Sequence, residues 1–293
     1  MTEYEKYSGD FEKDDVLNKL KIYHRSVKKY YIAKYSKNKD LLIDIGSGRG
    51  ADIETWILNN INMVVGIEPS VDSIKESIKR YKNFMNKYRN KKITKISFLN
   101  GVGDKNWNNG SAALRNEDVN RFIDLFDKKR IQADNINMCW TIHYMLDNKE
   151  DFKNLLINIK NHLKINGTIV ILTMDGDMIH EILKKNNGIY EIKKDTDVVF
   201  SLESLYDLDK DVEKEHYNNK ITVNMKATYG LEKGIGENLV FSDFLIKSFV
   251  RNGFELLEKT KFLDLPIDYK EKLFDYEKKI SSLYLGFVFK KIE

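Results

Sequence analysis

The sequence predicts an α/β fold built on a doubly wound, mostly parallel sheet. Apolar runs of strand length alternate with stretches of helix length from residue 15 to residue 173, which is the pattern of parallel strands covered on both faces. A glycine-rich turn joins the first strand to the next helix. With 42% hydrophobic and 32% charged residues, the chain of 293 residues has enough apolar side chains for a core, which excludes disordered and fibrous classes.

The first ten elements follow from periodicity. Apolar residues recur at three- and four-residue spacings over 15–35, which predicts an amphipathic helix. The short apolar runs at 41–45 and 63–67 predict the first two strands. Continuing in the same way, the chain is predicted to form helices over 52–59, 70–89, 118–126 and 147–163 and strands over 93–99, 135–139 and 168–173.

The pattern changes after Asp177. Short alternating runs at 190–193, 197–202 and 220–228, separated by polar turns, predict a small antiparallel insertion. A helix over 242–252 and a strand over 255–262 then resume the earlier pattern, and the terminal run 282–289 is expected to pair with that strand as a hairpin at the sheet edge.

The charge is distributed unevenly. The net charge is +4, but residues 13–39 hold nine Lys/Arg against two Asp, and residues 75–95 hold nine against one Glu. Clustered cations suit a phosphate backbone through counterion release. In a chain rich in lysine throughout, solvated helix faces explain the same clusters equally well.

Localisation signals are few. No window approaches 18 apolar residues and the first ten residues are charged, so we expect neither a membrane span nor Sec export. The one cysteine, Cys139, is expected to be a buried strand residue; it cannot form an intrachain disulfide, which fits a reducing compartment. We expect a cytosolic or nuclear protein.

The glycine turn predicts a ligand site. Gly46, Gly48 and Gly50 follow the first strand, where glycine permits close approach of the backbone and presents amides at a helix N-terminus. With Ala51 the turn also fits the G-x-G-x-x-A variant that binds a dinucleotide pyrophosphate. Glu68, 22 residues after Gly46, suits the ribose hydroxyls of either kind of cofactor.

Two further carboxylates favour one cofactor over the other. Asp44 precedes the glycines and Asp52 follows them. Negative charge suits the ammonium and sulfonium of S-adenosylmethionine better than a pyrophosphate. The alternatives are structural: Asp52 as a carboxylate at a helix N-terminus and Asp44 as a hydrogen-bonded strand residue.

Residues 44–52, DIGSGRGAD, resemble the cofactor loop D-x-G-x-G-x-G-x-D of the messenger RNA cap guanine-N7 methyltransferases. Four other segments resemble family motifs in the same order: HRSV at 24–27 the W-x-K-S-V stretch, IHY at 142–144 the H-Y motif, GENLV at 236–240 the late glutamate segment, and SLYLGF at 282–287 the final strand. The segment TMDGD at 173–177 is similar to the version in multidomain capping enzymes of large cytoplasmic DNA viruses.

The resemblance implies a Rossmann-like class I methyltransferase fold with a seven-stranded sheet, an antiparallel C-terminal hairpin and a small β-rich insertion. With no linker in the sequence, one domain over 1–293 is expected. Its parts are an N-terminal basic helix at 1–39, a cofactor-binding core at 40–185, an insertion at 186–240 that contributes to the cap pocket, and a C-terminal helix and strands at 241–293.

The resemblance also implies site residues. S-adenosylmethionine would be bound by Arg25, which would face its carboxylate, and by Asp44, Gly46, Gly48, Asp52, Glu68, Asp104 and Trp140. The cap guanine would be bound by Trp140, His143, Tyr144, Glu237 and Tyr284. Aromatic rings stack on bases, and a carboxylate accepts from guanine N1 and N2. No metal is implied.

Three departures from the family pattern bear on these residues: Val102 stands where a carboxylate contacts adenine, Trp140 replaces a Phe, and Asp175 replaces a proline. Without the resemblance, His143, Tyr144 and Trp140 are ordinary core or rim residues, Glu237 a solvated carboxylate in a glycine-rich loop, and Tyr284 a strand former.

The expected reaction is in-line methyl transfer to N7 of the cap guanosine, with no general base and no catalytic side chain, because N7 carries a lone pair and no proton. The expected partners are capped RNA, and RNA triphosphatase and guanylyltransferase modules in the same polypeptide or an activating subunit, at a cytoplasmic replication site if viral and in the nucleus if cellular. The alternatives are a methyltransferase of another RNA, a protein or a small molecule, and a catalytically silent RNA-binding subunit. A nicotinamide dehydrogenase is the least favoured.

Overall fold

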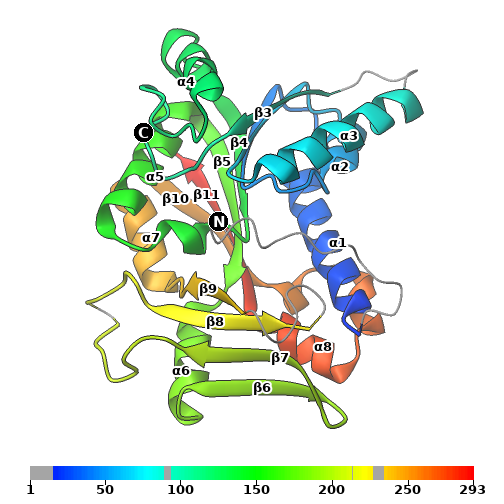
Figure 1. Ribbon diagram of the computed structural model, residues 1–293, viewed down its shortest axis with the longest axis vertical. Coiled ribbons are helices and arrows are strands. Elements are labelled where there is room, and N and C mark those ends of the chain that lie inside the picture. The colour runs from blue at the N-terminus through cyan, green and yellow to red at the C-terminus, as the bar shows by residue number, and fades with distance from the viewer. Residues whose placement is uncertain (1–15, 89–93, 213, 227–233) are drawn as a thin grey trace.

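The computed structural model describes residues 16–88, 94–212, 214–226 and 234–293. Its central sheet has seven strands in the order β10-β11-β5-β4-β1-β2-β3 (Figure 1). In chain order they are β1 (Leu41–Ile45), β2 (Met63–Glu68), β3 (Lys95–Asn100), β4 (Ala133–Cys139), β5 (Leu163–Met174), β10 (Phe254–Lys261) and β11 (Tyr284–Lys291). The first five pair in parallel, and β11 pairs antiparallel with both β5 and β10. The predicted α/β sheet is confirmed.

Helices cover both faces of this sheet because its strands alternate between two cores. In β1, Ile43 packs with α5 (Lys149–His162), α7 (Ser242–Arg251), α4 (Asn116–Phe122) and the π-helix that continues α4 over Ile123–Lys128. The adjacent Leu42 points the other way and packs with α1 (Asn18–Tyr35), α2 (Ile53–Leu58) and α3 (Val71–Lys87).

A second sheet confirms the antiparallel insertion. It has four strands in the order β6-β7-β8-β9, and its members are β6 (Ile189–Lys194), β7 (Asp197–Ser204), β8 (Lys220–Met225) and β9 (Ile235–Asn238). In Figure 1 it lies below the central sheet. Its apolar residues, among them Phe200 and Ile221, share a core with α1 and with one face of β5 and β11.

The sequence missed three elements: β9 and two short helices. The helix α6 (Gly176–Lys185) begins with glycine, a poor helix former, and is started by Asp175, whose side chain accepts from the Met178 N–H at 3.1 Å. The helix α8 (Asp275–Ser281) has only seven residues. Because α8 and two 3-10 turns separate β10 from β11, the two strands pair as expected but do not form a tight hairpin.

The largest difference in element boundaries is at β5, which begins at Leu163 instead of residue 168. The helix before it ends at His162, one residue before the predicted end. A register shift between Ala133 and Asn135 accommodates the extra strand residues. Parts of the predictions at 1–15, 89, 93 and 227–228 lie outside the described residues. Among the described residues, no helix is long and apolar enough to cross a membrane.

Candidate active site

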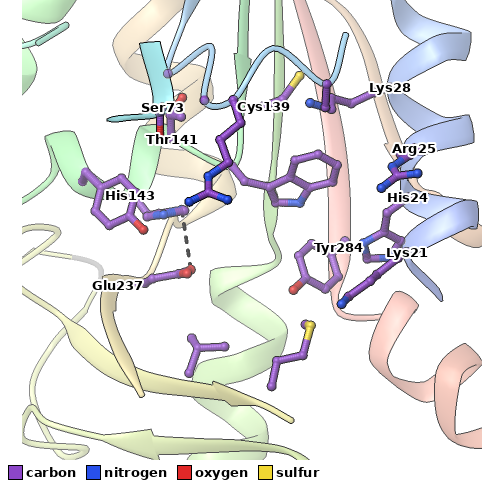
Figure 2. Close-up of a pocket in the computed structure, with 18 of the residues that line it drawn as sticks. Lys21, His24, Arg25, Lys28, Ser73, Cys139, Thr141, His143, Glu237 and Tyr284 are labelled. Carbon is purple, nitrogen blue, oxygen red and sulfur yellow. Dashed lines mark ion pairs between the residues drawn. The ribbon is translucent and has the colours of Figure 1, made fainter. Parts of the chain in front are cut away.

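A cavity of about 440 Å³ opens at the carboxyl ends of β1, β2 and β4. The strand order places β1 between β2 and β4, and in doubly wound sheets ligands bind outside the carboxyl ends of the strands at such a switch point. The cavity is lined from three directions: by α1, by the glycine turn after β1, and by the wall that β4, β9 and β11 form. Figure 2 shows the side chains of α1 on one side and His143 and Glu237 on the other.

The glycine turn needs its glycines for two reasons. Gly46, Gly48 and Gly50 have φ of +76°, +57° and +71°, in the left-handed region that side chains disfavour. A Cβ on Gly46 would overlap the Thr141 side chain, whereas a Cβ on Gly48 meets nothing within 4 Å. Gly48 therefore faces open space at the cavity, where the backbone can approach a ligand.

Glu68, the last residue of β2, holds this turn. Its Oε2 accepts from the Gly48 N–H at 2.8 Å and its Oε1 accepts from the Ser70 N–H at 2.9 Å. Burial raises the pKa of Glu68 despite these two hydrogen bonds. Glu68 lines the cavity, so its remaining lone pairs can accept from hydroxyls of a bound ligand.

Asp44 and Asp52 are buried and are not among the cavity-lining residues. Lys28 of α1, which does line the cavity, donates to Asp52 Oδ2. Burial alone would lower the pKa of Lys28. The negative charge of Asp52 raises this pKa, Cys139 and Asp44 add smaller effects in the same direction, and the net pKa is raised. Burial raises the pKa of Asp44 to about 7, and Asp52 adds to the rise. Lys28 is thus ion-paired with Asp52, and a ligand cation near Asp44 would favour the ionised form of that carboxyl.

One stripe of α1 faces the cavity. Lys21, His24, Arg25 and Lys28 are spaced by three and four residues, so they share one face of the helix, and all four line the cavity. Figure 2 shows them on the same side. Arg25 is exposed and lines the cavity, and a guanidinium suits an anionic group of a ligand.

The opposite wall holds a buried acid and a buried imidazole. The 3-10 turn Ile142–Met145 carries His143 and Tyr144, and β9 carries Glu237. His143 Nδ1 lies 3.6 Å from Glu237 Oε2. Burial raises the pKa of Glu237 to about 8 and lowers that of His143 to about 3. At neutral pH the imidazole is therefore neutral and the carboxyl holds its proton.

Aromatic rings complete this part of the site. Trp140 follows β4 with a φ of +57°, a strained conformation for a bulky residue, of the kind that clusters at functional sites. The His24 ring lies parallel to Trp140, with centroids 5.9 Å apart, and edge-on to Tyr284 at 4.8 Å. Burial lowers the pKa of His24 to about 3, so the ring is neutral.

Most of the predicted site residues meet in this cavity. Arg25, Gly46, Gly48, Glu68, Trp140, His143, Tyr144, Glu237 and Tyr284 line it. Asp104 does not; it lies half-buried after β3, where burial raises its pKa. A smaller cavity of about 20 Å³ beside the first is lined by Val102 and Gly103. Asp175 caps α6 and lines neither cavity. Glu237, expected in a loop, is in a strand.

Several lining residues were missed by the sequence analysis. Lys21 and Lys28 were counted only as part of a basic segment, although their spacing from Arg25 along one helix face could have singled them out. Others include Arg49, Arg80, Val223 and Met225, brought in by the glycine turn, α3 and β8. Cys139, expected to be buried, is half-buried and also lines the cavity. Among the described residues, no three acidic, histidine or cysteine side chains are grouped to hold a metal ion.

The sequence of the chain is similar to those of named mRNA-capping proteins. The mRNA (guanine-N(7))-methyltransferase domain matches residues 10–292. The probable mRNA-capping enzyme of Acanthamoeba polyphaga mimivirus is 28% identical over 292 residues, 92% of this chain and 24% of the relative. The mRNA-capping enzyme of African swine fever virus (strain Badajoz 1971 Vero-adapted) is 25% identical over 81% of this chain and 26% of the relative. The mRNA cap guanine-N(7) methyltransferase of Saccharomyces cerevisiae is 25% identical over 59% of this chain and 38% of the relative.

The chain thus spans about a quarter of the length of these viral relatives. Solved structures share its fold: an S-adenosylmethionine-dependent methyltransferase from Clostridium acetobutylicum has a TM-score of 0.53 at 12% identity, over 95% of this chain and 93% of that one. A putative one from Listeria monocytogenes has a TM-score of 0.55 at 12% identity, over 92% of this chain and 99% of that one. These confirm the predicted fold class. By the match over nearly its whole length, the chain belongs to the mRNA (guanine-N(7))-methyltransferase family.

Proposed function

We propose that the chain transfers the methyl group of S-adenosylmethionine to N7 of the guanosine cap of RNA. The observation that carries the proposal is one continuous cavity: Gly46, Gly48 and Glu68 line it at the end that would hold the cofactor, and His143 and Glu237 at the end that would hold guanine. The methyl group of the cofactor and N7 of the guanine would then lie next to each other in one cavity. This suits a reaction that is accelerated mainly by alignment of the two reacting atoms.

The residues at the first end fit the cofactor. Glu68 offers carboxylate lone pairs to ribose hydroxyls beside the open approach at Gly48. Lys28 is ion-paired with Asp52, and the pKa of Asp44 is raised, so the methionyl ammonium would favour the ionised form of Asp44. Arg25 would face the cofactor carboxylate. Bound S-adenosylmethionine supplies the electrophilic methyl group.

The residues at the second end fit guanine. Glu237, once ionised, can accept from both N1–H and N2–H of guanine, whereas adenine offers no such pair of donors. Burial makes the ionised form of Glu237 costly, so only a base that donates to the carboxylate would stabilise that form, and a base without those donors would lack this interaction. Trp140 and Tyr284 would pack on the base with Tyr144.

The side chains act by position. N7 attacks the methyl carbon with its own lone pair, so no group has to remove a proton. His143 is neutral, and its Nε2 is buried without a hydrogen-bond partner among the described residues; it would orient the guanosine. The carboxylates around the cavity would accommodate the positive charge that the guanine ring acquires.

Capped RNA is the proposed partner. Cationic side chains of Lys21, Arg25, Arg49 and Arg80 line the cavity and would contact the triphosphate bridge and the RNA that follows. The viral relatives named capping enzymes are about four times longer than this chain. We therefore propose that RNA triphosphatase and guanylyltransferase modules lie in the same polypeptide, or else that an activating subunit binds the chain. The place of action would be a cytoplasmic replication site if the chain is viral and the nucleus if it is cellular.

The test is methyl transfer from labelled S-adenosylmethionine to guanosine-capped RNA, with adenosine-capped and uncapped triphosphate RNA as controls. Nuclease digestion then locates the label. Label at guanine N7 on the guanosine cap alone is the expected result. Label elsewhere would indicate a methyltransferase of another substrate, and no binding of the cofactor would favour a catalytically silent RNA-binding subunit.

A further inference from the structure

One buried carboxylate serves the N-termini of two helices. Glu277 of α8 is 0% exposed. Its Oε2 accepts from the Phe274 N–H of its own helix at 3.0 Å, and its Oε1 accepts from the Leu20 N–H of α1 at 2.9 Å. Among the described residues, no lysine or arginine forms an ion pair with it. Both hydrogen bonds therefore come from backbone amides, at the positive ends of two helix dipoles.

Within the described residues, no side chain from the start of α1 caps this helix. Leu17 occupies the N-cap position and makes no side-chain cap hydrogen bond, and the first turn has no acidic residue. Amides of a first turn have no partner within their helix. In α1 the Leu20 amide, in the third helical position, is satisfied by Glu277 from a segment 257 residues away in sequence. This hydrogen bond therefore ties the start of α1 to α8.

Other contacts between the two helices do not substitute for this one. Tyr276 Oη donates to the Val16 carbonyl at 3.0 Å, before the helix begins. His24 Nε2 lies 3.2 Å from Ser281 Oγ, a neutral contact at the opposite end of α8. Of the three, only Glu277 brings a carboxylate, and hydrogen bonds to charged groups are the stronger kind.

The residue that Glu277 bonds lies at the edge of the cavity. Leu20 lines the cavity, and the stripe that follows on α1, from Lys21 through Arg25 to Lys28, forms one of its walls. Tyr284 also lines it; its ring packs edge-on against His24 of α1 at 4.8 Å, and it begins β11 three residues after α8 ends. Glu277 thus connects α1 with the segment that leads into β11, and both line the cavity.

We infer that Glu277 is a positioning residue of the active site: by capping α1 from α8, it sets the position of the cationic stripe of α1 relative to β11, which begins at Tyr284. The inference rests on the proposed function only for the identity of the ligands. Loss of the cap would let the start of α1 move away from the cavity and would weaken binding of both substrates, since Lys21 and Arg25 would no longer be held in place.

The test compares Glu277→Ala and Glu277→Gln in the full chain. The control is Asp118→Ala, because Asp118 is also 0% exposed but bonds Arg115 and Arg121 beside α4, outside the cavity. Three quantities are measured: hydrogen exchange of the amides at 18–28, the melting temperature, and KM and kcat for capped RNA and S-adenosylmethionine. The dissociation constant of S-adenosylhomocysteine is measured alongside.

Glu277→Ala is expected to speed exchange at 18–28 and to raise both KM values about tenfold, an energy of about one charged hydrogen bond, with kcat within about twofold. Glu277→Gln keeps one acceptor oxygen for Leu20 and is expected to recover most of the loss; it also serves if the alanine variant does not fold. Asp118→Ala is expected to lower the melting temperature with unchanged KM.

Two results would overturn the inference. Unchanged exchange at 18–28 would show that Glu277 does not hold α1, and unchanged KM values despite faster exchange would show that the position of α1 does not matter. A wild-type chain that binds S-adenosylhomocysteine but methylates no capped RNA would refute the proposed function instead. The dissociation constant of S-adenosylhomocysteine in the variants would then decide on Glu277.

Discussion

Replacing Glu237 with glutamine tests whether the buried acid of the cavity is built to ionise on demand. Burial raises the pKa of Glu237 from 4.5 to about 8 in the folded chain. A raised folded pKa means that the native state binds this proton more tightly than the unfolded state does. The stability that the carboxyl contributes is therefore fully present below pH 4.5 and is lost as the pH rises to about 8.

The size of this loss follows from the shift. At about 1.4 kcal/mol for each pKa unit, moving the pKa from 4.5 to about 8 makes a difference of roughly 5 kcal/mol in unfolding free energy between the two ends of the range. Glutamine does not titrate, so the Glu237→Gln variant escapes this decline. Its stability relative to wild type should rise from pH 5 to about pH 8 and level off above that pH.

Urea unfolding of both chains across that range measures the difference directly. Glu203→Gln is the control, because Glu203 is an exposed carboxyl on β7 of the same sheet. A free-energy difference between wild type and Glu237→Gln that stays constant with pH, within about 1 kcal/mol, would refute the reasoning. The corresponding binding experiment has the opposite sense: wild type should bind a guanosine cap analogue more tightly at pH 8 than at pH 6, and the variant should bind it weakly at both.

Three further predictions concern the other end of the cavity and its rim. Because Asp44 has a pKa raised to about 7 and a ligand ammonium favours its ionised form, S-adenosylhomocysteine should bind more weakly as the pH falls from 8 to 6; calorimetry with Asp44→Asn should show no such slope. A Cβ at Gly46 overlaps Thr141, so Gly46→Ala should lower the melting temperature more than Gly48→Ala, and adding Thr141→Ser should restore part of the loss; equal effects of the two alanines would contradict the packing argument. The affinity for capped RNA should fall steeply between 50 and 200 mM salt, and a flat titration would remove the two basic segments from the RNA path.

The fold was predictable wherever one physical signal dominated. All five residues of the strand at 41–45 are buried. The mostly apolar run in the sequence therefore begins and ends where the strand does. The helix α6 was not predictable in this way, because Gly176 at its first position has poor helix propensity and the capping Asp175 was interpreted as part of a motif. Likewise β9 is only four residues long and contains a glycine and an asparagine, residue types that are depleted in strands.

The site was predictable as a set of residues but not as a layout. The motifs predicted Glu68, His143 and Glu237 as site residues, and all three line one cavity. The same motifs gave Asp44 and Asp52 as direct ligand contacts, whereas in the structure Lys28 pairs with Asp52 at the cavity. The two residues of that ion pair lie 24 positions apart, one on a helix and one after the glycine turn. The spacing of residues within a single helix or loop cannot predict a contact between two such segments.

The two ends of the cavity come from different parts of the chain, and this has a consequence for how the site can be altered. Gly48, in the turn after β1, and Glu68, at the end of β2, belong to the shared α/β core. Glu237, together with Val223 and Met225, comes from the inserted sheet. Substitutions in β8 and β9 should therefore change affinity for the base while leaving affinity for the cofactor almost unchanged. Helix α1 lines the cavity with several side chains, among them those of Lys21, His24, Arg25 and Lys28. A change in its position is therefore expected to weaken binding of both ligands together.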